Sequence, residues 1–306
     1  MLSKNKKKII VTIIIPFFNI IKFRKILIKN INKIYQNNFQ YIFVDDGSKD
    51  DTFFFLKKKF YKKNFIYLRL RKNYGPGIAR NHALKFAKGK YILFLDSDDV
   101  INIKSLCLIL KAIKNKTFDL FFYDFMKKDF YLKKLSDLKK IDNKSALNLF
   151  LRKELDMSVN HCLFNKNFLK QNKLAFSSGL YEDILFMSKC FFYAKKLSSK
   201  KILVYFKKSR NLSITNTFTN KNTNFFIKSC IEKFKFFCNK KELFDNLQYG
   251  LRGDYCSVLK MNKKSNQKIK KNVIDKIFKK MIDINFIEKT HYDKIVNKNL
   301  FSVYEI

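Results

Sequence analysis

The first hundred residues alternate short apolar runs with segments whose apolar residues recur at helical spacing. The run IIVTIIIP at 9–16 is rich in β-branched residues and ends at a proline, as a buried strand does. Residues 22–36 carry apolar residues three or four positions apart, which predicts a helix. Further strands are predicted at 41–44, 65–70 and 91–95, and further helices after residue 48 and at 77–89. This alternation of strands and helices predicts an α/β protein with a mostly parallel, doubly wound sheet.

Polar residues follow three of these four strands, at 16–19, 45–48 and 96–99. In doubly wound sheets, ligands bind outside the carboxyl ends of the strands, near the point where the strand order reverses. The three polar segments together therefore predict a ligand site at this edge of the sheet.

The rest of the chain is less regular. Residues 104–215 mix amphipathic stretches with a further strand, KILVYF at 201–206. Beyond residue 216 the chain is rich in Lys and Asn and has helical apolar spacing. We therefore expect one domain at 1–215 and a basic helical region at 216–306, with a soft boundary because no Pro- or Gly-rich linker separates them.

The stretch FLDSDD at 94–99 gathers three carboxylates directly after a strand, with no Arg nearby in the sequence. Asp96 and Asp98 are two residues apart, so in an extended segment their side chains would point the same way. A hard cation with oxygen ligands relieves such repulsion, and one held by only one or two carboxylates keeps positions open for phosphate oxygens. For an isolated D-x-D, an acidic turn that caps the next helix is the more frequent explanation.

This D-x-D is not isolated. IIIPFFN at 13–19, VDDGSKDDT at 44–52 and NYGPGIARN at 73–81 come before it in that order. With these four motifs the chain resembles the family 2 glycosyltransferases over roughly residues 10–215. The resemblance implies the GT-A fold, with a donor half at about 1–100 and an acceptor half at about 101–215. It also implies inverting transfer from a nucleotide-sugar donor, with a divalent metal, Mn²⁺ or Mg²⁺, as cofactor.

The resemblance assigns the donor site residue by residue. It implies that Asp96 contacts the ribose or diphosphate of a UDP-sugar and that Asp98, with Asp96, holds the metal. It also implies that Asp45 or Asp46 contacts the nucleotide base. Pro16 and Phe17 are expected along the uridine. Arg80 is a candidate donor-side cation, and its alternative role, pairing with a helix or loop acid, stays open.

A second signal lies in GLYEDILFM at 179–187. Glu182 and Asp183 open a predicted helix, where the helix dipole favours carboxylates in any case. The family has such a pair, followed by an aromatic residue, and the resemblance implies that Asp183 is the catalytic base. A base of this kind takes the proton from an acceptor hydroxyl as its oxygen attacks the anomeric carbon. Glu182 and His161 are acceptor-side candidates, although a lone His is more often a structural residue.

A third signal is YFKKSRNLSIT at 205–215. It is similar to a family segment that folds over the donor diphosphate. Lys208 stands where the family often has Arg, so bidentate phosphate binding is either lost or moved to Arg210. Cys162 replaces a Lys common in relatives. Both departures fall in the acceptor half and bear on acceptor identity more than on the donor fold.

The formal net charge of +40 adds a competing hypothesis. Of the 65 basic residues only seven are Arg, and the lysines are spread along the chain. Readers of bases and phosphates usually rely on Arg, so a solvated lysine surface explains the charge better than nucleic-acid binding, and we expect no nucleic-acid partner. A non-enzymatic protein that binds nucleic acid or an anionic membrane stays as the alternative. A nucleotidyltransferase would normally have a Gly-rich phosphate loop after the first strand, which IIIPFFN lacks.

Six cysteines without C-x-x-C spacing fit thiols in a reducing compartment. The apolar run at 9–21 is interrupted by Pro16 and Asn19, lacks a cleavage site and is shorter than the roughly 20 residues of a membrane span. We expect a cytoplasmic enzyme, peripheral on the inner face of the membrane. The expected acceptor is a hydroxyl of a lipid-linked oligosaccharide, lipooligosaccharide or capsule-type glycan. The basic C-terminal helices also suit an anionic membrane surface.

Overall fold

The computed structural model describes residues 9–126, 142–155, 158–207 and 219–282. By its internal contacts the chain divides into two compact units. Unit 1 comprises residues 1–126, 159–179 and 193–208, and unit 2 comprises residues 127–158, 180–192 and 209–306. The boundary that we expected near residue 215 stays a prediction.

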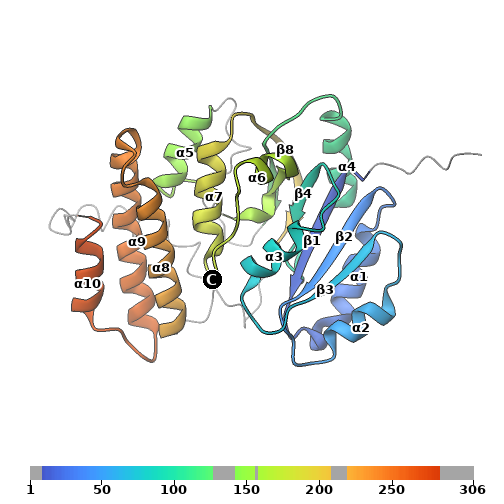
Figure 1. Ribbon diagram of the computed structural model, residues 1–306, viewed down its shortest axis with the longest axis horizontal. Helices are drawn as coiled ribbons and strands as arrows, with labels where there is room; N and C mark the ends of the chain where they lie inside the picture. The colour runs from blue at the N-terminus through green and yellow to red at the C-terminus, as the bar shows by residue number, and fades with distance from the viewer. Residues whose placement is uncertain (1–8, 127–141, 156–157, 208–218, 283–306) are drawn as a thin grey trace, which may run out of the picture. The chain divides into compact units, whose positions relative to one another are not determined.

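Unit 1 is built on an eight-stranded mixed sheet in the order β3-β2-β1-β4-β7-β6-β8-β5. Figure 1 shows the neighbouring strands β1, β2 and β3 of this sheet. The strands are β1 (Val11–Phe17), β2 (Phe39–Asp45), β3 (Phe65–Arg69), β4 (Tyr91–Phe94), β5 (Val100–Ile101), β6 (Leu120–Met126), β7 (Cys162–Asn165) and β8 (Leu197–Phe206). The strands β3, β2, β1 and β4 run parallel, whereas β7 pairs antiparallel with both β4 and β6. The predicted α/β fold with a mostly parallel sheet is confirmed, and the four predicted N-terminal strands match β1 to β4 within two residues at each end.

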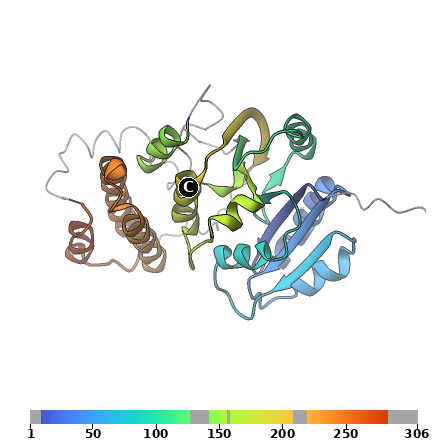
Figure 2. The same cartoon turned by 45° about the horizontal axis from the view of Figure 1, so that its top comes forward.

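The helices of unit 1 cover both faces of this sheet. They are η1 (Ile21–Phe23), α1 (Arg24–Ile34), α2 (Thr52–Lys59), α3 (Pro76–Leu84), α4 (Ile103–Ala112), η3 (Val159–His161) and α6 (Lys166–Gln171). The helix α3 packs on β1 and β2, and α1 and α2 lie on the opposite face of these strands (Figures 1 and 2). Crossovers from β1 to β3 therefore run along one face, and the return to β4 runs along the other, as right-handed connections require.

The strand order reverses between β1 and β4. The chain moves outward from β1 to β2 to β3 and then returns to place β4 on the other side of β1. All residues of β1, β2 and β4 are buried, which explains their near-continuous apolar sequences. The carboxyl ends of β1 and β4 therefore form the switch point at which ligands bind in such sheets.

The described part of unit 2 is helical. Its helices are α5 (Asn143–Leu151), α7 (Glu182–Tyr193, whose last residue belongs to unit 1), α8 (Asn220–Phe237), η5 (Lys241–Leu243), α9 (Phe244–Lys264) and α10 (Lys271–Lys279). The helix α9 contacts α5, α8 and α10. The expected C-terminal helices are therefore present. None of the helices in the described ranges is long and apolar enough to cross a membrane.

The contact between α5 and α9 depends on a glycine. A Cβ atom built on Gly250 of α9 would lie 1.8 Å from the carbonyl oxygen of Leu151, the last residue of α5. One turn later, a Cβ on Gly253 would meet only the Cδ atom of Lys153, at an ordinary 3.4 Å. The helix backbone can therefore approach the end of α5 only because residue 250 has no side chain.

A charged cluster is buried in the same region. Asp254 of α9 is paired with Lys153 at 2.9 Å and with Lys233 of α8. The side chains of Asp254 and Lys233 are 1% and 3% exposed. Burial opposes the ionised form of Asp254, but the two ammonium groups outweigh it and lower the pKa to about 2. This cluster joins α8, α9 and the chain that follows α5.

None of the six cysteines, all of which lie within the described ranges, forms a disulfide. Cys162, Cys190, Cys230 and Cys256 are buried. Burial raises the pKa of Cys230, and nearby Asp254 raises it further. These thiols are packing residues.

Candidate functional site at the carboxyl edge of the sheet

The three predicted polar segments lie side by side at one edge of the unit 1 sheet. Phe17, the last residue of β1, is in register with Asp45, the last residue of β2, and Asp45 is in register with Arg69 of β3. On the other side of β1, Ile14 is in register with the end of β4. The sequence-based expectation that these strand ends share one edge agrees with this register.

The β1 motif carries two adjacent aromatic rings that differ in exposure. The side chains of Pro16 and Phe17 are buried within the strand pattern of β1. Phe18 is 39% exposed and follows the strand directly. Of the two adjacent rings, Phe18 is therefore the one with surface available to stack on a ligand.

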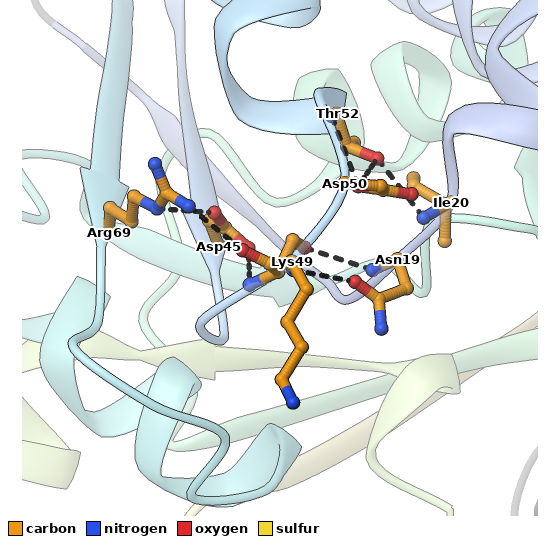
Figure 3. A network of polar contacts seen from close by, with 8 residues as sticks. Asn19, Ile20, Asp45, Lys49, Asp50, Thr52 and Arg69 are labelled. Atoms are coloured by element: carbon orange, nitrogen blue, oxygen red, sulfur yellow. Dashed lines mark hydrogen bonds and ion pairs between the residues drawn. The ribbon is translucent and has the colours of Figure 1, made fainter.

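Hydrogen bonds clip the loop after β1 to the loop after β2 (Figure 3). The backbone N–H of Asn19 donates to Ser48 Oγ at 2.9 Å. The side-chain Oδ1 of Asn19 accepts the N–H of Lys49 at 2.8 Å. Next along the chain, Ile20 N–H donates to Thr52 Oγ1 at 3.1 Å. Asn19 has a left-handed backbone with φ of 50°, a conformation that Asn tolerates better than most residues. The IIIPFFN and VDDGSKDDT motifs are thus parts of one rigid arrangement.

Asp45 anchors this arrangement at the end of β2. It is fully buried, and its Oδ1 accepts the N–H of Ser48 at 2.8 Å. Its Oδ2 lies 3.1 Å from Arg69 Nε, and Arg69 Nη2 donates to the carbonyl of Ser48 at 2.8 Å (Figure 3). Asp45 therefore shapes the loop that follows β2.

Asp46 ties the same strand end to the NYGPG segment. Its Oδ1 and Oδ2 accept the backbone N–H groups of Tyr74 and Gly75, each at 2.9 Å. Burial raises the pKa of Asp46, nearby Asp45 raises it further, and the two N–H groups act in the opposite direction. Gly75 has φ of 93°, and a Cβ there would lie 2.8 Å from the carbonyl oxygen of Gly179. Both carboxylates assigned to the nucleotide base thus hold loops in place.

The D-x-D segment is a turn rather than an extended strand end. The strand β4 ends at Phe94, and the N–H of Asp99 donates to the carbonyl of Asp96 at 3.1 Å. The expectation that strand alternation aligns Asp96 and Asp98 was therefore wrong, because the chain has already turned. Asp98 is partly exposed on this turn, and Asp99 is buried.

Arg80 pairs with Asp96. Its Nη2 lies 2.9 Å from Asp96 Oδ1, and the arginine is 4% exposed. The guanidinium lies over the rings of Phe94 and Phe176, at 5.9 and 5.4 Å from their centroids. Of the two roles left open for Arg80, the structure shows the pairing with a loop acid. An Arg that is remote in sequence therefore compensates the acidic turn.

Two residues that sequence reasoning missed also hold this turn. Asn160 of η3 donates from Nδ2 to Asp96 Oδ2 at 2.9 Å. The hydroxyl of Tyr205 in β8 donates to Asp99 Oδ2 at 2.6 Å and accepts the N–H of Asp96 at 3.3 Å. Neither interaction has a local sequence signal, because the partners are more than 60 positions apart.

The charge of Asp96 is stabilised by these neighbours. Burial opposes ionisation, but Arg80 and Lys207, together with the hydrogen bond from Asn160, outweigh it and lower the pKa of Asp96. Lys207 directly follows β8, one residue before Lys208.

Lys208 and Arg210, the cations assigned to the diphosphate, lie outside the described residues.

His161, an acceptor-side candidate, is 4% exposed and stacks on Phe125, with ring centroids 4.4 Å apart. This environment is that of a packed structural ring.

The other candidates, Glu182 and Asp183, lie in unit 2 and form the first turn of α7. Glu182 is buried and Asp183 is partly exposed. Burial, with the nearby charge of Asp183, raises the pKa of Tyr181 to about 12.

The described residues contain no group of three or more His, Cys, Asp or Glu side chains that could hold a metal ion by themselves. Both oxygens of Asp96 are engaged by Arg80 and Asn160, and Asp98 is partly exposed. This donor set fits a hard cation such as Mg²⁺ only if one or two carboxylates bind it and phosphate oxygens or water fill its remaining positions.

The chain is similar to known proteins in sequence and in fold. Over 174 residues it is 30% identical to a poly(ribitol-phosphate) beta-glucosyltransferase of Bacillus spizizenii, which covers 53% of this chain and 26% of that protein. Over 225 residues it is 27% identical to a processive diacylglycerol beta-glycosyltransferase of Mycoplasma genitalium, which covers 67% of this chain and 66% of that protein. The chain thus spans about a quarter and two thirds of these relatives.

The fold is similar to that of S. aureus TarS residues 1–349, solved in complex with UDP-GlcNAc. The TM-score is 0.67 at 19% sequence identity, over 97% of this chain and 90% of that one. This likeness confirms the expected GT-A fold. The model of the family described as Glycosyl transferase family 2 matches residues 12–172, more than half of the chain. The chain belongs to glycosyl transferase family 2.

Proposed function

We propose that this protein is an inverting, metal-dependent glycosyltransferase that moves a sugar from a UDP-sugar to a hydroxyl of a glycan or glycolipid acceptor. The observation that carries the proposal is the position of the acidic turn at 96–99, which follows β4 at the switch point of the parallel strands. At the same edge, the loops after β1 and β2 are joined by the hydrogen bond between Asn19 and Ser48. Switch points bind ligands, and Asp98 on this turn is a partly exposed carboxylate, the kind of oxygen ligand that a hard cation takes.

The proposed donor site lies along the carboxyl ends of β1, β2 and β4. The loop clip at Asn19 and Ser48, with exposed Phe18 beside it, would receive the uridine. Asp98, with Asp96 beside it, would hold Mn²⁺ or Mg²⁺. When bound, this cation neutralises the charge that develops on the departing diphosphate, so that no general acid is needed on that side. We also assign Lys208 and Arg210 to the diphosphate, as the motif at 205–215 suggests.

The proposed base is Asp183. It lies at the start of α7, partly exposed, whereas its neighbour Glu182 is buried. In an inverting transfer one carboxylate removes the proton from the acceptor hydroxyl as the oxygen attacks the anomeric carbon. With only three histidines in the chain, and His161 stacked on Phe125, a carboxylate is the better candidate for this role.

The acceptor is proposed from chemistry and from the relatives. Names of relatives include poly(ribitol-phosphate) and diacylglycerol transferases, so acceptors there are polymers or lipids that carry hydroxyl groups. A chain of net charge +40 suits an anionic or membrane-bound acceptor of this kind. We propose a lipid-linked acceptor at the cytoplasmic face of the membrane.

Calorimetric titration tests the donor class. The protein is titrated with UDP, GDP and CDP, each with and without Mn²⁺. We expect binding that is selective for UDP and that strengthens with the metal. If none of the three nucleotides binds under either condition, the proposal is wrong and the basic-surface alternative takes its place.

The metal role is tested by Asp98→Asn, with Asp51→Asn as the matched control. Asp51 is an exposed carboxylate at the same edge of unit 1 and its side chain makes no capping hydrogen bond, so the control makes the same charge change. We expect Asp98→Asn to abolish the gain in UDP binding on adding Mn²⁺ and Asp51→Asn to retain it. An equal loss in both variants would mean that net charge, not a metal ligand, is responsible.

A further inference from the structure

We infer that Asn160 and Tyr205 are positioning residues that hold the acidic turn at 96–99 in its ligand-binding conformation, an assignment that rests on the proposed function. Asn160 lies outside the motifs that mark the donor site in the sequence, and Tyr205 begins the segment at 205–215 but was given no role there. Both come from the second half of the chain, whereas Arg80 reaches the turn from α3.

Asn160 fixes the orientation of the Asp96 carboxylate. Arg80 Nη2 bonds Oδ1 and Asn160 Nδ2 bonds Oδ2, each at 2.9 Å, so the two donors together allow a single rotation of the group. The position of Asn160 is itself fixed, because the Tyr123 hydroxyl donates to the backbone carbonyl of Asn160 at 2.7 Å. Asn160 is also 4% exposed. Hydrogen bonds to a charged acceptor are among the stronger ones in proteins.

Tyr205 fixes the other end of the turn. One hydroxyl group accepts the N–H of Asp96 and donates to Asp99 Oδ2, so it links the first and the last residue of the turn. The ring is 1% exposed, in β8. A second contact closes the same end, because Asn30 Nδ2 donates to the carbonyl of Asp99 at 3.2 Å.

The turn needs such a clamp because three carboxylates lie within four residues and repel one another. With Asp96 held by Arg80 and Asn160, and Asp99 held by Tyr205, the partly exposed carboxylate of Asp98 is presented on a fixed backbone. Fixing the loop before the ligand arrives lowers the entropic cost of binding. The clamp thus acts on donor affinity through Asp96 and Asp99 rather than by touching the donor.

The test compares UDP affinity, measured by calorimetry with Mn²⁺, in Asn160→Ala and Tyr205→Phe. We expect each variant to bind UDP about tenfold more weakly, the loss typical of one charge-assisted hydrogen bond. The matched control is Asn165→Ala. Asn165 is a comparably buried Asn five residues along, and its side chain caps α6 instead of contacting the turn. The control should lose some stability but keep its UDP affinity.

Asn160→Asp separates positioning from mere packing. The new side chain has nearly the same shape as Asn but cannot donate, and it faces the Asp96 carboxylate with a second negative charge. A positioning role predicts that UDP affinity falls from wild type to Asn160→Ala and falls further in Asn160→Asp. A packing role predicts the reverse order of the two variants, because Asp fills the site and Ala does not.

Amide hydrogen exchange tests, in the absence of nucleotide, whether the hydrogen bonds of Asn160 and Tyr205 hold the turn. In Tyr205→Phe and Asn160→Ala we expect faster exchange in peptides covering residues 95–101 and unchanged exchange across β2 and α1. Unchanged exchange at 95–101 in both variants would overturn the clamp, as would UDP affinity equal to that of wild type. If wild type fails to bind UDP while exchange at 95–101 rises in the variants, the clamp stands and the proposed donor class is wrong.

Discussion

Asp96 in unit 1 and Asp254 in unit 2 are both held by basic partners, yet they differ in exposure. The side chain of Asp96 is 29% exposed, and that of Asp254 is 1% exposed. Asp96 is paired with Arg80 and also feels the charge of Lys207, whereas Asp254 is paired with Lys153 and Lys233. In both cases the surrounding positive charge outweighs burial and lowers the carboxyl pKa.

The difference separates the carboxylate that we propose for the donor site from one that serves the fold. At the carboxyl edge of the sheet, Asp96 keeps access to solvent and lies beside a second partly exposed acid, Asp98. Asp254 is sealed among helices, where it balances two ammonium groups and binds nothing from outside. A lowered pKa alone would not have told the two apart, whereas access to solvent does.

Asp183 sharpens this contrast, because it is a partly exposed acid within unit 2. We expect Asp183→Asn to reduce the rate of sugar transfer by about 10²- to 10⁴-fold, the range for loss of a general base, and to leave UDP affinity unchanged. Transfer is measured with labelled UDP-sugar, and binding is measured by calorimetry.

The matched control for this variant is Asp245→Asn, which removes an exposed carboxylate from the first turn of α9 in the same unit. It should transfer at the wild-type rate. Wild-type transfer by Asp183→Asn would show that another group is the base.

Asp254→Asn tests the structural side of the comparison. The substitution leaves the buried ammonium group of Lys233 and the partly exposed one of Lys153 without their counter-ion. Breaking a buried pair in this way costs about 3–5 kcal/mol of unfolding free energy. Urea unfolding measures the loss. UDP affinity of the fraction that folds should stay at the wild-type value.

Glu232→Gln is the control, because it breaks a surface pair with Lys228 on α8, whose N–O distance is 3.8 Å. Such pairs contribute only about 0.3–0.5 kcal/mol. If the two variants lost equal stability, burial would not be what distinguishes Asp254.

The two glycines of α9 test how closely α5 packs against it. Gly250→Ala places a Cβ 1.8 Å from the carbonyl oxygen of Leu151, so the backbone must shift, and we expect a loss of about 3 kcal/mol. Gly253→Ala meets only a flexible lysine stem and gains helix propensity, so we expect a gain of up to about 1 kcal/mol. Thermal unfolding measures the stability of both variants. Equal melting temperatures would contradict the close contact between α9 and α5.

The dependence of stability on pH at the acid side should show a smaller effect than Asp254→Asn or Gly250→Ala. The pKa of Asp254 is about 2 in the folded protein and 3.8 in the unfolded chain. Because the folded value is the lower one, the contribution is present above the unfolded pKa and is lost as pH falls toward 2. It amounts to about 2 kcal/mol and should fade below about pH 5. In Asp254→Asn the urea midpoint should fall less steeply over this range, and an unchanged slope would assign the acid sensitivity to other groups.

Much of unit 1 could be predicted because its signals are local. The β-branched runs, the glycines and the acids at strand ends of the first hundred residues gave four strands, their parallel order and one ligand edge. The antiparallel strand β7 and the pairing of β6 with β8 were not predicted, because strand neighbours from distant segments leave no mark on local periodicity.

The site itself shows the same limit. The acids at 45–46 and 96–99 were predicted from their position after strands, but their partners Arg69, Asn160 and Tyr205 were not. Nor did the sequence show that Phe17 is buried and Phe18 exposed, since the pattern of a fully buried strand does not reveal which of the rings after it reaches the surface. Local rules locate charged groups, whereas long-range contacts decide what each group is bonded to.

The close approach of α9 to α5 has a consequence for tracing the ancestry of this region. Lysine-rich surfaces tolerate exchange of one polar residue for another, so sequence identity across such helices decays quickly. Gly250 has no substitute while the Leu151 carbonyl lies where its Cβ would be, and Asp254 is tied to two lysines at once. The spacing G-x-x-x-D, formed by Gly250 and Asp254, should therefore outlast the rest of the helix as a marker of shared descent.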